Sequence, residues 1–148
     1  MNSITNLEKY LAEGNRFIRE LARELEHPEE LDQTERILRS VLHVLRDKIS
    51  TAESFHLMSQ LPAYLKLLYI EGWKYREKPL RIHSIEEFKE EIKNEQYRLG
   101  ERSFAWKMPT EQIISRVITS LRKYVSDGEF RDMLSNLPEE VHPLFGTY

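Results

Sequence analysis

Cysteine is absent from this 148-residue chain, and glycine and proline are scarce, with five and six residues. Without cysteine there is no disulfide, no thiolate zinc site, no iron–sulfur cluster and no cysteine nucleophile. The glycines are scattered along the chain, so no glycine-rich loop is available to hold a phosphate. Several common cofactor and nucleophilic chemistries are thereby excluded.

A long apolar run and a charge excess are missing as well. The longest unbroken aliphatic and aromatic stretch covers residues 67–70, far short of the roughly 20 residues that span a membrane. The N-terminus lacks the basic-then-apolar order of a secretory signal. The net charge is −3, without the basic excess typical of nucleic-acid-binding proteins. We therefore expect a soluble, cytoplasmic protein without a membrane segment, for which nucleic acid is a disfavoured partner.

The chain does contain an internal repeat. Shifted by 76 residues, the segment 34–69 lies over 110–145 without a gap. Identical residues occupy 12 of 36 pairs, where average composition gives about two. Each copy has an apolar stripe at helical spacing, followed by a Ser-x-x-Glu capping box and a Leu-Pro step. The stripes are Leu38, Val41, Leu42, Leu45 and Ile49 in the first copy and Ile114, Val117, Ile118, Leu121 and Val125 in the second.

Capping patterns predict where the helices begin. The predicted N-caps are Thr5, Asp32, Ser50, Ser84 and Ser126, each followed three residues later by glutamate. We therefore predict an all-α fold, a helical bundle built from two tandem copies of one helical unit with pseudo-twofold symmetry. Residues 1–148 are expected to form a single domain, with a first unit at about 5–70, a linker at 71–83 and a second unit at about 84–146.

The linker interleaves aromatic and basic residues, and it is the predicted functional segment. Trp73, Tyr75 and Arg76 are the candidate contacts with a partner, since such residues can anchor a protein or stack on bases beside phosphates. The alternative is that Trp73 fills the junction between the two units while the charges are solvated. The second connection, with Tyr97, Phe104 and Trp106, allows the same two interpretations, and there the structural one is favoured.

Two Glu-x-x-His patterns suggest a metal site, because this spacing puts two ligands on one helical face. They are Glu53 with His56 and Glu139 with His142. These pairs are not equivalent in the repeat, Glu53 is also a capping-box residue, and proline follows His142 directly. We therefore predict no metal and no other cofactor.

A catalytic role for His43 is likewise not supported by the sequence. His43 lies near Arg39 and Arg46 on the helix of the first stripe, and we expect it on the solvated face. No nucleophile is paired with it, and no residue is predicted to be catalytic.

Three segments together resemble the bacterial family catalogued as domain of unknown function 2267: the block 41–50, then Gln60-Leu61-Pro62, then Tyr69-Ile70-Glu71-Gly72-Trp73. The resemblance covers roughly residues 17–145. It implies a helical protein with no assigned activity, so no site residue is carried over. Our main functional expectation is a non-catalytic helical protein that acts as a protein-interaction or scaffold module. The alternative is a small-ligand or metal-dependent enzyme that uses Glu53, His56 or His142 in the cleft between the units.

Overall fold

A computed structural model of the chain describes residues 5–100 and 106–146. Every regular element in these two ranges is helical, as predicted, and no strand occurs in them. The elements are α1 (Asn6–Glu24), α2 (Leu31–Lys48), α3 (Thr51–Gln60), α4 (Ala63–Ile70), α5 (Ile85–Arg98), α6 (Thr110–Leu121), α7 (Asp127–Ser135) and the 3₁₀ helix η1 (Glu139–Phe145).

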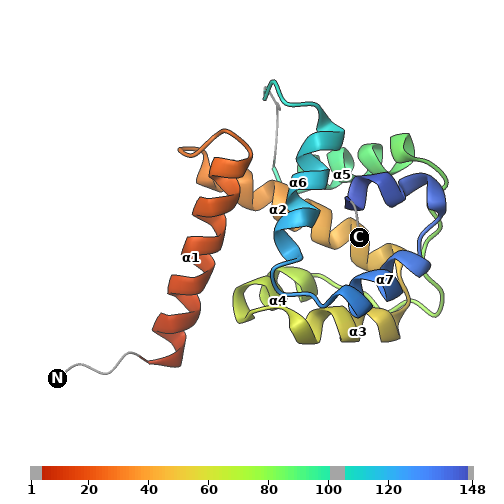
Figure 1. Cartoon of the computed structure of the whole chain (residues 1–148), viewed down its shortest axis with the longest axis horizontal. Helices are drawn as coiled ribbons and strands as arrows, with labels where there is room; N and C mark the ends of the chain where they lie inside the picture. The colour runs from red at the N-terminus through yellow and green to blue at the C-terminus, as the bar shows by residue number, and fades with distance from the viewer. Residues whose placement is uncertain (1–4, 101–105, 147–148) are drawn as a thin grey trace.

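Helix α2 lies at the centre of the arrangement (Figure 1). It packs against α1 and α4 from its own half of the chain, and against α5 and α6 from the other half. Helix α1 in turn contacts α6, while α3 and α7 lie against each other. One continuous hydrophobic core results, with side chains from every helix named above.

The two predicted apolar stripes form the middle of this core. Their side chains are between 0% and 6% exposed. Burying an aliphatic side chain of this size contributes roughly 1.5–3 kcal/mol, so the two stripes are a principal source of stability. Leu57 and Leu61 of the first copy, and Met133 and Leu137 of the second, are buried around them.

Four of the five predicted helix caps are confirmed. The hydroxyls of Thr5, Ser50, Ser84 and Ser126 each accept a hydrogen bond from the backbone N–H three residues later, at 3.1–3.2 Å. The fifth prediction, Asp32, is wrong. Helix α2 begins at Leu31 after Glu30, and no side chain caps it.

The start of α2 is fixed instead by the second connection. The Trp106 indole N–H donates a hydrogen bond to the Glu30 carboxylate, and its ring stacks on His27 at 4.2 Å between centroids. Trp106 is 8% exposed and joins the core, as the structural interpretation predicts, whereas Tyr97 is exposed. Phe104 lies outside the described residues.

The first turns of α1 stand clear of the body at one edge of the molecule (Figure 1). Leu7, Tyr10 and Leu11 are 67%, 44% and 58% exposed, and the helix is buried only from Gly14 onward. Gly14 is the point where α1 meets α4, since a Cβ there would lie 2.7 Å from Cγ of Tyr64. The apolar pattern of α1 is therefore only partly used by the core.

Among residues 5–100 and 106–146, no helix combines the length and the apolar character that crossing a membrane requires.

Candidate functional site

The linker is tied to α2 at both ends. Arg46, only 6% exposed, uses Nη1 to donate hydrogen bonds to the carbonyl oxygens of Tyr69 and Glu71, at 2.6 and 2.7 Å. Further along, the backbone N–H of Leu80 donates to the carbonyl of Asp47 at 2.8 Å. The path of the irregular segment between these points is thus set by the end of α2.

The three predicted contact residues have different environments. Trp73 is half-buried and packs against the core, with its ring 5.7 Å from that of Tyr69 and 5.8 Å from that of Phe55. Tyr75 is 77% exposed, and Arg76 is exposed with its Nε 3.9 Å from Asp47. Trp73 therefore closes the junction, while its two neighbours remain on the surface.

Phe55 is a surface residue that the sequence did not reveal. Phe55 belongs to α3 and is 56% exposed beside Trp73. We call Phe55, Trp73, Tyr75 and Arg76 the linker face. They come from α3 and the linker, so their proximity depends on the packing of segments about twenty residues apart.

A polar pocket of about 280 Å³ lies under the linker. Side chains of α2, the linker and α5 line it, with cationic groups outnumbering carboxylates. The cations are Arg46, Lys74, Arg76 and Arg98, with His43 beside them, and the carboxylates are Asp47 and Glu95. This surface is suited to contacts with a negatively charged group.

The prediction that His43 lies on the solvated face is wrong. The side chain is buried, with Nδ1 at 3.0 Å from Glu95 Oε1 and Nε2 at 2.9 Å from the carbonyl oxygen of Leu68. Burial raises the pKa of Glu95, but hydrogen bonds from Arg98 and His43 outweigh burial and hold that pKa below its usual range. The ring of His43 therefore lies between two groups that can accept a hydrogen bond, the Glu95 carboxylate and the Leu68 carbonyl. The ring therefore links α2, α4 and α5 as a structural element.

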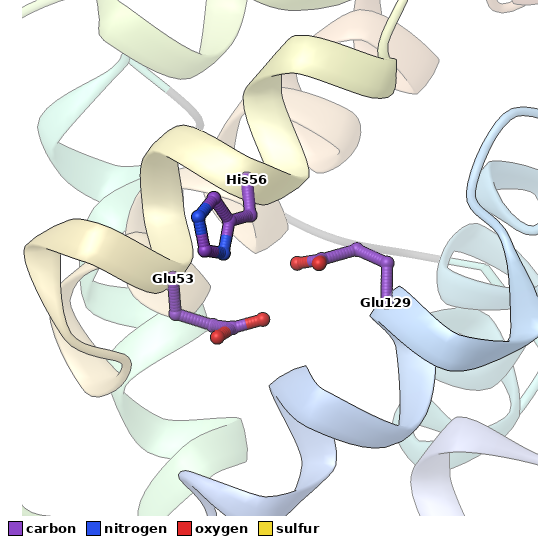
Figure 2. Close-up of side chains that lie close together, drawn as sticks. All are labelled: Glu53, His56 and Glu129. Atoms are coloured by element: carbon purple, nitrogen blue, oxygen red, sulfur yellow. The ribbon is translucent and has the colours of Figure 1, made fainter.

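A second group of chemically active side chains lies between α3 and α7 (Figure 2). Glu53 and His56 project from α3 toward Glu129 of α7, and each offers a ligand atom within 4.8 Å of the others. We call these three residues the seam cluster. Glu129 is 7% exposed, Glu53 is partly buried and His56 is exposed.

The capping boxes are only half formed, and this frees the two glutamates of the seam cluster. In a complete box each carboxylate would accept from the N–H of its capping serine. Instead, Ser50 N–H donates to Asn136 Oδ1 at 3.0 Å, and Ser126 N–H donates to Gln60 Oε1 at 2.7 Å. Amides from the opposite half thus replace both carboxylates at the helix ends.

The freed carboxylates face each other in a largely buried setting. Burial, the adjacent carboxylate of Glu53 and the charge of Asp132 together raise the pKa of Glu129 to about 8. The Oε1 atoms of both glutamates are buried without a hydrogen-bond partner in the described part of the chain. Two buried like charges are unfavourable, so the pair requires a proton or a cation between them.

The other Glu-x-x-His pattern has no such geometry. His142 places Nε2 at 2.9 Å from the carbonyl oxygen of Leu134 and 3.0 Å from that of Leu137. This nitrogen is therefore engaged by backbone carbonyls at the end of α7 and just after it. The first predicted pair, Glu53 and His56, therefore belongs to the seam cluster. The second pair, Glu139 and His142, is not part of it.

Glu129 is the residue of the seam cluster that the sequence analysis missed. The signal was present, because the 76-residue shift places Glu129 on Glu53 and Asp132 on His56. The sequence does not show that α3 and α7 pack against each other, and this contact is what brings Glu129 to Glu53.

The described residues form an all-helical protein whose two halves pack together through several pairs of helices, α2 with α5 and α3 with α7 among them. A family model described as an uncharacterized conserved protein (DUF2267) matches residues 14–144. The chain belongs to this family. A comparison with curated proteins gives no match.

Proposed function

We propose that this protein is a non-catalytic interaction module whose linker face binds another protein. The observation that carries the proposal is the Phe55–Trp73 ring pair at the surface, with Tyr75 and Arg76 beside it. Aromatic residues and arginine are the types that most often dominate the binding energy of interfaces. Exposed apolar surface that forms a patch often marks an interaction site, and Phe55 is 56% exposed where it meets Trp73.

The charge around the linker face indicates the chemistry of the partner. The linker, residues 71–83, carries Lys74, Arg76, Lys78 and Arg81 against two carboxylates, those of Glu71 and Glu77, although the whole chain has a net charge of −3. Aromatic anchors with a basic rim suit a partner segment that combines an apolar side chain with acidic residues. A protein partner of this kind is favoured over nucleic acid because the basic residues are few and confined to one loop.

We further propose that the two halves are copies of one unit related by a pseudo-twofold axis between α3 and α7, and that the protein works in the cytoplasm. When a twofold axis relates two copies, each contact between them occurs twice, with the roles of the two copies exchanged. The bonds Ser50–Asn136 and Ser126–Gln60 form such a reciprocal pair under the 76-residue shift. The packing of α1 on α6 and of α5 on α2 supports the same relation.

The proposal is tested by identifying and then measuring a partner. Tagged protein is used to capture partners from the native cell extract, and the strongest candidate is purified for calorimetry. We expect Tyr75→Ala to weaken binding by about tenfold or more. Arg76→Glu should also weaken binding, and its effect should be larger at low salt than at high salt because salt screens the charges. Trp73 is left intact because it packs against the core.

Tyr97→Ala is the matched control, since it removes an exposed tyrosine from α5 rather than from the linker. We expect it to bind like the wild-type protein. Equal affinity of all variants for the partner would exclude the linker face as the site. Retention on DNA or RNA at low salt, lost with Arg76→Glu, would instead indicate nucleic acid.

A further inference from the structure

We propose that the seam cluster of Glu53, His56 and Glu129 binds a divalent first-row transition metal ion such as Zn²⁺ or Mn²⁺. The three side chains approach one another from two helices of different halves, with their ligand atoms within 4.8 Å of each other (Figure 2). This site shares α3 with the linker face but uses different side chains. A bound metal ion would join the two halves of the chain, because it would be bonded to side chains from both.

Unsatisfied buried oxygens are the first support for a cation. Glu129 is 7% exposed, and therefore 93% buried, and its side chain points into the cluster. Its Oε1 atom has no hydrogen-bond partner among the described residues. Glu53 contributes a second buried Oε1 in the same condition. Buried carboxylate oxygens are nearly always paired, and exceptions call for an unseen ion, water or proton.

The second support is that the surrounding structure satisfies the helix ends by other means. The side-chain amide oxygens of Gln60 and Asn136 accept hydrogen bonds from the backbone N–H groups of the two capping serines. In complete capping boxes the glutamates would accept these bonds. The same exchange occurs at both helix starts. The carboxylates are therefore kept available at the seam instead of being used as caps.

The geometry is close to that of a coordinated ion. Ligand atoms at about 2.0–2.2 Å from one metal ion lie about 3.3 Å from each other. The ligand atoms of the three side chains must therefore approach one another by about 1 Å on binding. His56 is exposed and free to rotate toward the carboxylates. Asp132, one turn after Glu129, is also exposed and close enough to influence its charge. It can supply a fourth ligand, and water can fill the remaining positions.

The donor types determine which metals fit. An imidazole nitrogen with two carboxylates suits zinc, manganese or iron. Calcium and magnesium prefer oxygen ligands alone, and magnesium keeps most of its water. We therefore expect Zn²⁺ and Mn²⁺ to bind in preference to Mg²⁺ and Ca²⁺.

The test uses full-length protein treated with chelator and then dialysed free of it. Thermal unfolding and calorimetry are recorded with Zn²⁺, Mn²⁺, Mg²⁺ or Ca²⁺. At a Zn²⁺ concentration about 100-fold above Kd, we expect Tm to rise by about 5–10 °C. Glu129→Gln and His56→Ala should each weaken Zn²⁺ binding by at least about tenfold and remove most of the rise.

His83→Ala is the matched control, because His83 is an exposed histidine that is not part of the seam cluster. It should respond to Zn²⁺ like the wild-type protein. If Glu129→Gln fails to fold, His56→Ala decides the question, because its exposed side chain is not part of the core. The proposal is overturned if wild-type Tm does not respond to metal, which would mean that the glutamates only share a proton. It is also overturned if the response persists in both seam variants.

Discussion

At the scale of single residues, Arg46 is a buried cation with a structural role. It holds the end of α4 and the start of the linker through two carbonyl oxygens. Replacement by methionine keeps much of the side-chain volume but removes both donors. Leaving the two carbonyls unpaired should lower the free energy of unfolding by about 2–4 kcal/mol.

Urea denaturation followed by circular dichroism measures this loss. Arg81→Met serves as the comparison, because Arg81 is exposed in the same linker, and we expect a change within about 0.5 kcal/mol. Similar stabilities for the two variants would show that the linker is not anchored through Arg46.

His43 shows where residue-level prediction reaches its limit. Helical periodicity correctly placed Leu42 and Leu45 in the core, yet it assigned the neighbouring face of α2 to solvent. The error arises because α5, which is far away in the sequence, covers that face and brings Glu95 to the ring. A periodic pattern reports which face is most apolar, and it cannot report a polar residue buried by a distant helix.

At the scale of helices, local sequence signals were sufficient in most places. Thr5, Ser50, Ser84 and Ser126 cap helices as predicted because an N-cap depends on residues only three positions apart. Asp32 fails because a long-range contact between Trp106 and Glu30 shapes the entry to α2. The second half of the capping boxes at Ser50 and Ser126 also fails, because amides from the other half of the chain replace the glutamates there.

Gly14 provides a test of how α1 meets α4. Glycine within a helix normally costs roughly 1 kcal/mol relative to alanine. At this position, however, an added Cβ would collide with Tyr64 near its backbone end. We expect Gly14→Ala to lower the free energy of unfolding by about 1–2 kcal/mol, because overpacking outweighs the gain in helix propensity.

Gly128→Ala is the matched substitution, since Gly128 is also helical and no atom lies within 4 Å of its added Cβ. It should leave stability unchanged or increase it by up to about 1 kcal/mol. Both variants are compared by thermal and urea unfolding. A stabilising effect of Gly14→Ala would mean that the two helices can separate at little cost.

At the scale of the whole molecule, the halves depend on each other. The buried stripe of α2 is covered by α5 and α6, and α1 rests on α6. We expect peptides 1–77 and 78–148, prepared separately, to lack cooperative unfolding because each leaves its apolar stripe in water. Mixing them should restore helical circular dichroism and a single melting transition. A cooperative transition in either peptide alone would contradict this interdependence.

The internal repeat predicted this organisation in outline. It indicated two helical segments with matching stripes, and both stripes are buried together. It did not indicate which helices would touch, so neither the meeting of α3 with α7 nor the seam cluster could be placed from sequence. The first turns of α1 carry apolar side chains that the core does not cover, since Leu7 and Leu11 are exposed.

The two tryptophans give the molecule a pair of separate optical reporters. Trp73 lies at the linker beside Phe55 and Tyr69, whereas Trp106 stacks on His27 near the end of α1. Their indoles have different neighbours and belong to different connections. Fluorescence from variants that retain one indole each can therefore follow events at the linker and at the far end of the core independently, without an attached dye.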